Sequence, residues 1–208
     1  MHAIGFNRRT ATKVRNGKVQ RKNRHQFTAR LGYVLDRESP RKGFRHVITK
    51  RDLGEFTDLI PDWAELSVGL ERIVLGGGDP HEHLDGLYEH FHREQTGAIV
   101  IHAWQGDLWA RFENSYYAAH REVLGLLQVK ATQERDSWLC FFTKAQARAF
   151  LLLHVFMHEL GHHHDRMKYK QQDSCRGGEV YAENFANSRL SEMLPRYVAR
   201  FGDPALAG

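Results

Sequence analysis

The sequence His-Glu-Leu-Gly-His at positions 158–162 constrains this chain of 208 residues more than any other feature. It lies inside an apolar run, residues 150–167, that predicts a buried helix. Residues four positions apart lie one above the other on one face of a helix. Two imidazoles so placed can bind one metal ion, and the carboxylate of Glu159 between them can reach a water on that ion. The segment therefore predicts a helix that holds zinc.

The residues before this motif support a long and rigid helix. Thr143 and Gln146 have the spacing of a capping box, in which each side chain bonds the backbone N–H of the other residue at a helix start. The helix then begins about four turns before the motif. The apolar residues 150–157 would bury it and hold the metal-binding side chains in place.

A catalytic zinc ion takes three protein ligands and keeps a fourth position for water. Asp165 is a poor third ligand, because its backbone lies roughly 10 Å from that of His158 along a straight helix. We expect it to orient a ligand imidazole or to pair with a neighbouring basic side chain. His163 and His164 point away from the ligand face and are expected at an exposed polar end. Cys175 would suit a closed structural site better.

Glu179 fits the third position best. Gly177 and Gly178 break the chain, and Glu179 then opens an amphipathic helix that Pro195 is expected to end. Small residues on its apolar face would let this helix pack antiparallel to the motif helix. Glu183, one turn later, either fixes a ligand imidazole through a hydrogen bond or takes the ligand position itself.

The two segments together resemble the gluzincins, a group of zinc metallopeptidases. The residues that carry the resemblance are His158-Glu-Leu-Gly-His162 and Glu179-Val-Tyr-Ala182-Glu183-Asn-Phe185-Ala186. They look most like the small phage antirepressor and radiation-response regulator peptidases, over residues 143–194. The resemblance implies one Zn²⁺ bound by His158, His162 and Glu179, with Glu159 as catalytic base and Glu183 orienting a ligand.

The sequence departs from two related patterns. Metzincins need Gly where Asp165 stands and a third His where Lys168 stands. No clear counterpart is found for the His or Tyr with which larger gluzincins stabilise the oxyanion. The candidates for that role, none favoured by the sequence, are Tyr181, Arg176, His163 and Tyr169.

The order of predicted elements indicates an α+β fold. An N-terminal, mostly antiparallel β-sheet with helices is expected to precede the active-site helix and the C-terminal ligand-bearing helix. Strands are expected at residues 31–35, 44–49 and 137–142, a hairpin at 97–112, and helices at 83–93 and 115–129. The resemblance implies that a substrate lies as an added strand along a sheet edge, and the hairpin is the candidate edge.

Charge divides the chain near residue 51. Residues 1–51 carry 15 Lys and Arg against two acidic residues, whereas residues 52–208 carry 15 against 23. The first 26 residues lack hydrophobic periodicity and predict a flexible basic arm, followed by a single zincin-like domain at 27–208. The basic region 1–51 can contact nucleic acid through phosphates, or the arm can merely dock on its own acidic domain or aid solubility.

Composition indicates a cytoplasmic protein that does not cross a membrane. The longest apolar run, residues 149–157, is too short to span a bilayer, and the first residues lack the apolar core of a signal peptide. Cys140 and Cys175 imply no disulfide framework, and Cys140 is expected as an inert core thiol.

These observations predict a zinc-dependent metallopeptidase that acts on a protein or peptide substrate. The alternative is a non-enzymatic, zinc-stabilised domain whose basic arm binds nucleic acid. Glu159 disfavours this alternative, because a structural site has no use for a carboxylate aimed at an open ligand position.

Overall fold

The computed structural model describes residues 14–15, 18–19, 32–78, 85–168 and 177–206. Along the chain its elements are β1 (Val14–Arg15), β2 (Lys18–Val19), β3 (Val34–Arg37), β4 (Phe44–Arg45), α1 (Lys50–Thr57), α2 (Trp63–Leu66), β5 (Leu70–Gly76), β6 (Gly86–Phe91), β7 (Thr96–His102), β8 (Trp104–Gln105), β9 (Trp109–Glu113), α3 (Asn114–Ala119), α4 (Arg121–Leu126), β10 (Lys130–Gln133), β11 (Ser137–Phe141), α5 (Lys144–Phe150), the π-helix η1 (Leu151–Phe156), α6 (Met157–Lys168) and α7 (Gly178–Phe201). The predicted arm, residues 1–26, lies outside the described residues except for β1 and β2, which pair with each other.

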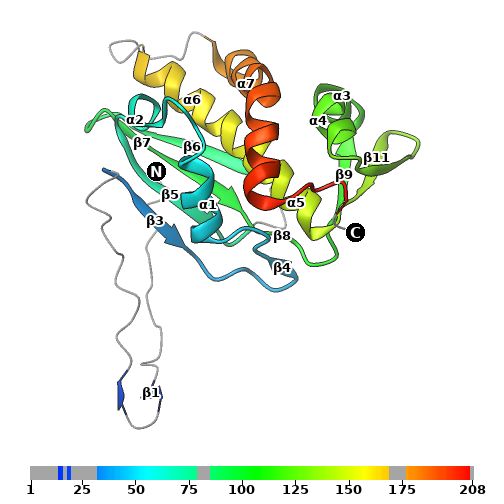
Figure 1. Cartoon of the computed structure of the whole chain (residues 1–208), viewed down its shortest axis with the longest axis horizontal. Coiled ribbons are helices and arrows are strands. Elements are labelled where there is room, and N and C mark those ends of the chain that lie inside the picture. The colour runs from blue at the N-terminus through cyan, green and yellow to red at the C-terminus, as the bar shows by residue number, and fades with distance from the viewer. Residues whose placement is uncertain (1–13, 16–17, 20–31, 79–84, 169–176, 207–208) are drawn as a thin grey trace.

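The main sheet has the strand order β3-β5-β7-β6. β3 pairs with β5, and β5 with β7, in parallel, whereas the outer strand β6 runs antiparallel to β7. The α+β class is confirmed, but the expectation of a mostly antiparallel sheet is wrong for these four strands. A parallel pair needs a crossover, and α1 and α2 supply it between β3 and β5. Figure 1 shows α1 and α6 lying over this sheet.

The expected hairpin at 97–112 and the expected helix at 83–93 are both wrong. β7 lies inside the main sheet between β5 and β6, because its apolar residues are buried between two neighbouring strands. β9 belongs to a separate three-stranded sheet with the order β10-β11-β9. The part of 83–93 that the structure describes forms β6, an edge strand that is half-buried along most of its length. Its Leu87, Tyr88 and Phe91 therefore give no clear two-residue alternation.

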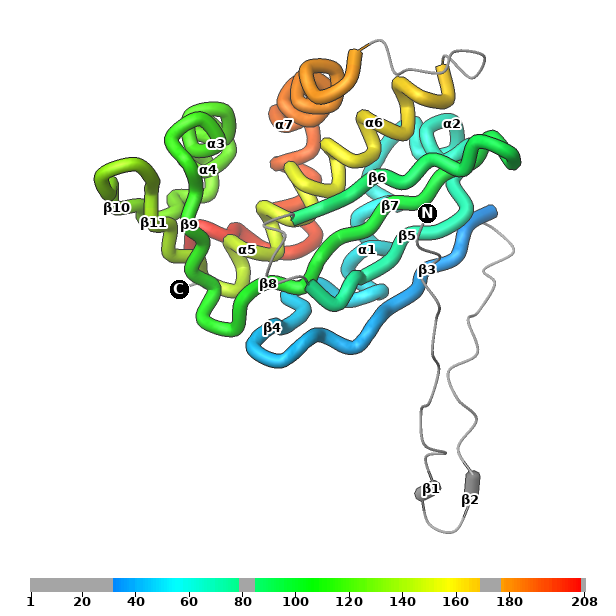
Figure 2. The backbone as a smooth tube through the Cα atoms, turned by 180° about the vertical axis from the view of Figure 1, so that it is seen from behind, coloured from blue at the N-terminus to red at the C-terminus, as the bar shows by residue number. Residues whose placement is uncertain are grey.

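The three-stranded sheet carries α3 and α4, which replace the single helix expected at 115–129. The helix breaks at His120, whose backbone (φ −98°, ψ 6°) is not helical. β11 then leads directly into α5, as the predicted strand at 137–142 requires. Figure 2 shows this unit at one end of the molecule, beside the N-terminal part of the long helix.

The long helix runs without a break through α5, η1 and α6. The predicted capping box is confirmed: Thr143 Oγ1 accepts from the backbone of Gln146 at 3.2 Å, and Gln146 Oε1 accepts from the backbone of Thr143 at 2.8 Å. The middle of the helix, Leu151–Phe156, is π-helical and fully buried. π-helical turns are rare in proteins, and those that occur often lie at functional sites.

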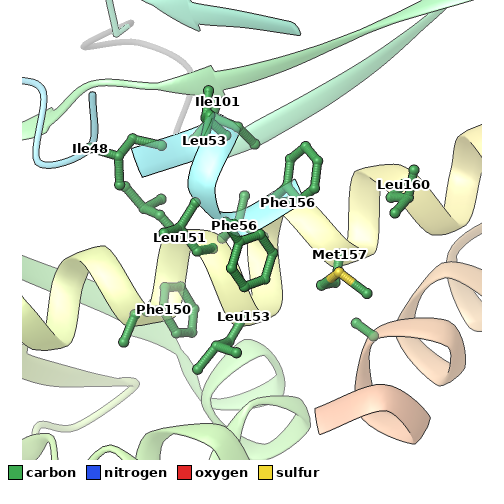
Figure 3. Packing of buried hydrophobic residues seen from close by; sticks show 14 of the residues in the cluster. Ile48, Leu53, Phe56, Ile101, Phe150, Leu151, Leu153, Phe156, Met157 and Leu160 are labelled. Carbon is green, nitrogen blue, oxygen red and sulfur yellow. The ribbon is translucent and has the colours of Figure 1, made fainter. Parts of the chain in front are cut away.

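Apolar side chains hold the long helix against α1 and the sheet. Leu53 and Phe56 from α1, Ile101 from β7, and Leu151 and Phe156 from the long helix are at most 1% exposed, and Figure 3 shows them meeting in one cluster. The rings of Phe56 and Phe156 pack edge to face at 5.9 Å. The burial of each such apolar side chain contributes about 1.5–3 kcal/mol to the stability of the fold. The histidines of the motif are therefore carried on a helix that is fixed along its apolar side.

α7 runs antiparallel to the long helix and continues past Pro195, so the expected stop at Pro195 is wrong. Pro195 is exposed, so water can reach the carbonyl that its missing N–H leaves unpaired. Beyond it, Tyr197 is fully buried, and Arg148 donates to the Tyr197 hydroxyl at 3.2 Å and to the Phe201 carbonyl at 3.1 Å. These contacts offset the lost bond. No described helix, α7 included, is long and apolar enough to cross a membrane.

The two helices approach most closely at Gly161. A Cβ added to Gly161 would lie 2.8 Å from Ala182 Cα and 3.1 Å from Phe185 Cβ, both in α7. Ala182 is itself fully buried. A glycine facing an alanine therefore sets the spacing between the motif helix and α7.

Replacing Gly161 by Ala is expected to force α7 away from α6, because the new methyl group would meet backbone. We expect a loss of about 1–3 kcal/mol in the free energy of unfolding, measured by urea denaturation. The control is Gly54→Ala in α1, where nothing lies within 4 Å of the added Cβ, and which should stabilise by about 1 kcal/mol. Equal stability of the Gly161 variant and the native chain would contradict this account of the packing.

Candidate metal centre

Three side chains from two helices converge at one point beside the α6–α7 contact. His158 and His162 lie one turn apart on α6, and Glu179 lies in the first turn of α7. His158 Nε2 is 3.2 Å from His162 Nε2 and 3.2 Å from Glu179 Oε2, and His162 Nε2 is 3.4 Å from Glu179 Oε1. The structure thus brings together all three residues that the sequence proposes as metal ligands.

These separations fit a tetrahedral ion. Ligand atoms about 2.0–2.1 Å from such an ion lie roughly 3.3 Å from one another. The side chains of His158 and His162 are 18% and 16% exposed, whereas that of Glu179 is 82% exposed. The two imidazoles are therefore largely covered by the protein, whereas the Glu179 side of the site faces solvent. Such a site has a rigid base and room for a water in the fourth position.

Glu183 lies behind His158, one turn after Glu179. The Nδ1–H of His158 faces Glu183 Oε2 at 3.3 Å, and Asn187 Nδ2 donates to Glu183 Oε1 at 3.0 Å. Burial opposes ionisation of Glu183, but the bond from His158 and the nearby His154 and His120 lower its pKa to about 2. A carboxylate so placed keeps the Nε2 lone pair of His158 directed at the metal position.

Negative charge surrounds the two imidazoles. Burial would lower the pKa of His158, but the hydrogen bond to Glu183 and the charges of Glu159, Glu179 and Glu183 raise it above its usual value. Burial and the neighbouring His158 lower the pKa of His162. Carboxylates that favour a proton on His158 favour a metal cation in the same place.

Glu159 is only 7% exposed and lies between α6 and the edge strand β6. Burial raises the pKa of Glu159 to about 7, although the nearby His158 and a backbone hydrogen bond from Tyr88 act to lower it. A Cβ added to Gly86, the first residue of β6, would lie 2.7 Å from Glu159 Oε1. Only a glycine at this position leaves room for the carboxylate. A bound divalent cation would oppose the rise in pKa.

Other predicted residues take different places. Asp165 does not join the ligands; it is buried and accepts a hydrogen bond from the backbone N–H of Gly177 at 3.1 Å, which ties the end of α6 to the start of α7. The expectation that His163 is exposed is wrong. Its Nε2–H donates to the Val68 carbonyl at 3.1 Å and its ring packs on Tyr88, so it has no access to the metal position.

Of the four candidates for oxyanion stabilisation, Tyr181 also points elsewhere, because its hydroxyl bonds His164 Nδ1 at 2.7 Å. Tyr169 and Arg176 lie outside the described residues, as does Cys175. Cys140 is fully buried, and burial raises its pKa to about 11, as expected of an inert core thiol.

Sequence reasoning missed two residues near this centre. Gly86 touches Glu159 because β6 lies along α6, and a strand misread as a helix gave no sign of this contact. His120 is buried beside His154, at a ring distance of 4.2 Å. The one available signal was a histidine in the middle of an otherwise ordinary amphipathic stretch.

Comparisons of this chain with protein-family models, with curated proteins and with solved structures found no match. The resemblance to the gluzincins therefore depends on the motif residues themselves.

Removal of one proposed ligand tests the centre directly. Glu179→Ala should weaken zinc binding by at least roughly tenfold, because the remaining imidazoles leave the ion with two protein ligands. Equilibrium dialysis with Zn²⁺ measures this. The matched control is Glu192→Ala on the same helix, an exposed carboxylate that pairs with Arg196 at 3.0 Å. If both variants bind zinc as tightly as the native chain, Glu179 is not a ligand.

Proposed function

We propose that this protein is a zinc-dependent metallopeptidase that hydrolyses peptide bonds. The observation that carries the proposal is the meeting of His158, His162 and Glu179, with the buried carboxylate of Glu159 beside them. Two neutral nitrogen donors and one carboxylate oxygen form a donor set that zinc uses in catalytic sites. When bound, zinc lowers the pKa of a coordinated water toward about 7 and polarises a carbonyl group.

Glu159 is the proposed general base. It takes a proton from the attacking water and passes it to the leaving nitrogen as the C–N bond breaks, so that the group departs as a neutral amine. The backbone hydrogen bond from Tyr88 and the close approach of Gly86 restrict this carboxylate to one position. Burial keeps water from solvating it, which makes it a stronger base toward a proton placed within its reach.

The proposed substrate is a protein or peptide that lies along β6. This strand forms an outer edge of the main sheet, pairs with β7 on its inner side, and begins at the residue that touches Glu159. An extended chain added beside such an edge gains backbone hydrogen bonds. β6 thus replaces the hairpin at 97–112 as the candidate edge, because β7 is interior and β9 belongs to another sheet.

The remaining functional expectations stay predictions. These are a cytoplasmic location, which fits the free and buried Cys140, and contact of the basic residues 1–51 with nucleic acid. The non-enzymatic alternative gains no support from the placement of Glu159, because a structural site does not require a buried carboxylate next to its ligands.

Glu159→Gln tests the reaction. The amide keeps the size of the side chain but cannot accept the proton, so hydrolysis should slow by roughly 10²–10⁴-fold. Zinc content, measured on the same samples, should not change, because Glu159 is not a ligand. Cleavage of a mixed peptide library followed by mass spectrometry is the readout. A variant as active as the native chain would rule out Glu159 as base.

Gly86→Ala tests the position of that base. The added methyl group would lie 2.7 Å from Glu159 Oε1 and 2.8 Å from Val155 Cγ1, so the carboxylate must move. We expect peptide hydrolysis to fall roughly 10- to 100-fold with zinc still bound. The control is Gly125→Ala on α4, where the added Cβ meets nothing within 4 Å. Unchanged hydrolysis by the Gly86 variant would show that β6 does not position Glu159.

A further inference from the structure

A second group of metal-binding side chains lies behind the candidate metal centre. His120, His154 and Glu183 each place one possible ligand atom within 4.8 Å of those of the other two. They come from three separate elements: the break between α3 and α4, the π-helix η1, and α7. The first two are almost fully buried, at 7% and 3% exposed, and Glu183 is 24% exposed. Three donors from distant parts of the chain thus meet in the interior.

The ring of His120 is held as a metal ligand usually is. Its Nδ1–H donates to the carbonyl of Tyr116 at 2.7 Å, and its ring stacks on that of Tyr116 at 3.9 Å. A neutral imidazole that donates from Nδ1 carries its free lone pair on Nε2. Ligand histidines commonly donate their other ring N–H to a backbone carbonyl in this way.

His154 supplies the second nitrogen. Its Nε2 lies 3.6 Å from Glu183 Oε2, which is too long for a hydrogen bond but close to the separation of two atoms bound to one ion. His154 is 3% exposed, and burial of this kind favours the neutral imidazole, which keeps a lone pair. Its position in a π-helical turn is a separate sign of a functional role.

Glu183 can serve both centres. Each carboxylate oxygen has two lone pairs. Oε1 accepts from Asn187, and Oε2 lies 3.3 Å from Nδ1 of His158 and 3.6 Å from Nε2 of His154. Orientation of His158 therefore uses one lone pair of Oε2 and leaves the other for an ion.

We propose that His120, His154 and Glu183 form a second zinc site, behind the candidate metal centre and separate from it. Neutral imidazoles and a carboxylate suit a borderline divalent ion such as Zn²⁺. The ion would join the unit of α3, α4 and the three-stranded sheet to the long helix and to α7. The site needs no peptidase activity, although it shares Glu183 with the candidate metal centre.

Zinc stoichiometry of the full-length chain tests this proposal. The protein is stripped with a chelator, dialysed, and titrated with Zn²⁺ alone by calorimetry, with bound metal measured by plasma mass spectrometry. We expect two ions for each chain. His120→Asn and His154→Phe should each lower this number to one. The control His46→Asn should keep two, because the His46 ring bonds the Glu38 carbonyl at 3.0 Å and belongs to neither group of ligands.

The same measurement separates this proposal from the proposed function. His158→Ala should also leave one ion, now held by His120, His154 and Glu183. If the native chain binds one ion that His158→Ala abolishes and His120→Asn retains, the second site is overturned and the candidate metal centre stands. If the native chain instead binds one ion that His120→Asn abolishes and His158→Ala retains, the second site stands and the candidate metal centre is overturned.

Folding of each variant is checked by far-ultraviolet circular dichroism. If the native chain binds one ion, the variants show which site holds it, and a native chain that binds no zinc overturns the proposal. Two ions that persist in folded His120→Asn would overturn the assigned ligands.

Discussion

The close contact between α6 and α7 is the constraint on which the rest of this structure depends. Gly161 and Ala182 leave no room for a larger side chain between the helices. Only at this spacing can Glu179 reach the same point as the two motif histidines, 3.2 Å from one and 3.4 Å from the other. Apolar contacts with α1 and the sheet fix the long helix that carries the two histidines. The hydrogen bonds from Arg148 to Tyr197 and Phe201 fix the end of α7, the helix that carries Glu179.

The three glutamates near the candidate metal centre differ in their burial and in the charges around them. Glu179 is exposed and can meet an ion from the solvent side, whereas Glu183 is partly covered and bonds the back of His158. Glu159 is buried against β6, where desolvation raises its pKa. Three residues of one type thus acquire different chemistry from their surroundings alone. His120 and His154 extend this polar region inward, where a cation would balance donors that are otherwise costly to bury.

The parts predictable from sequence were those governed by local spacing. The capping box of Thr143 and the one-turn spacing of the motif histidines follow from helical geometry. The position of Glu179 in the first turn of a helix follows from the two glycines before it. Long-range pairing was not predictable. The spacing of Leu87, Tyr88 and Phe91 suits a helix as well as a half-buried edge strand. β7 pairs with β6 on one side and in parallel with β5 on the other, and local spacing does not reveal these pairings. His163 is buried by Tyr88, which is 75 residues away in the chain. Pro195 stays helical because Tyr197 packs in the core.

Anomalous diffraction at the zinc absorption edge, from crystals of the full-length chain grown with Zn²⁺, shows directly whether His158, His162 and Glu179 bind one ion. We expect an anomalous peak within about 2.0–2.2 Å of His158 Nε2, His162 Nε2 and a Glu179 oxygen, with Glu159 unbound beside it. A peak that Glu179 does not touch, or no peak between the two imidazoles, would contradict it.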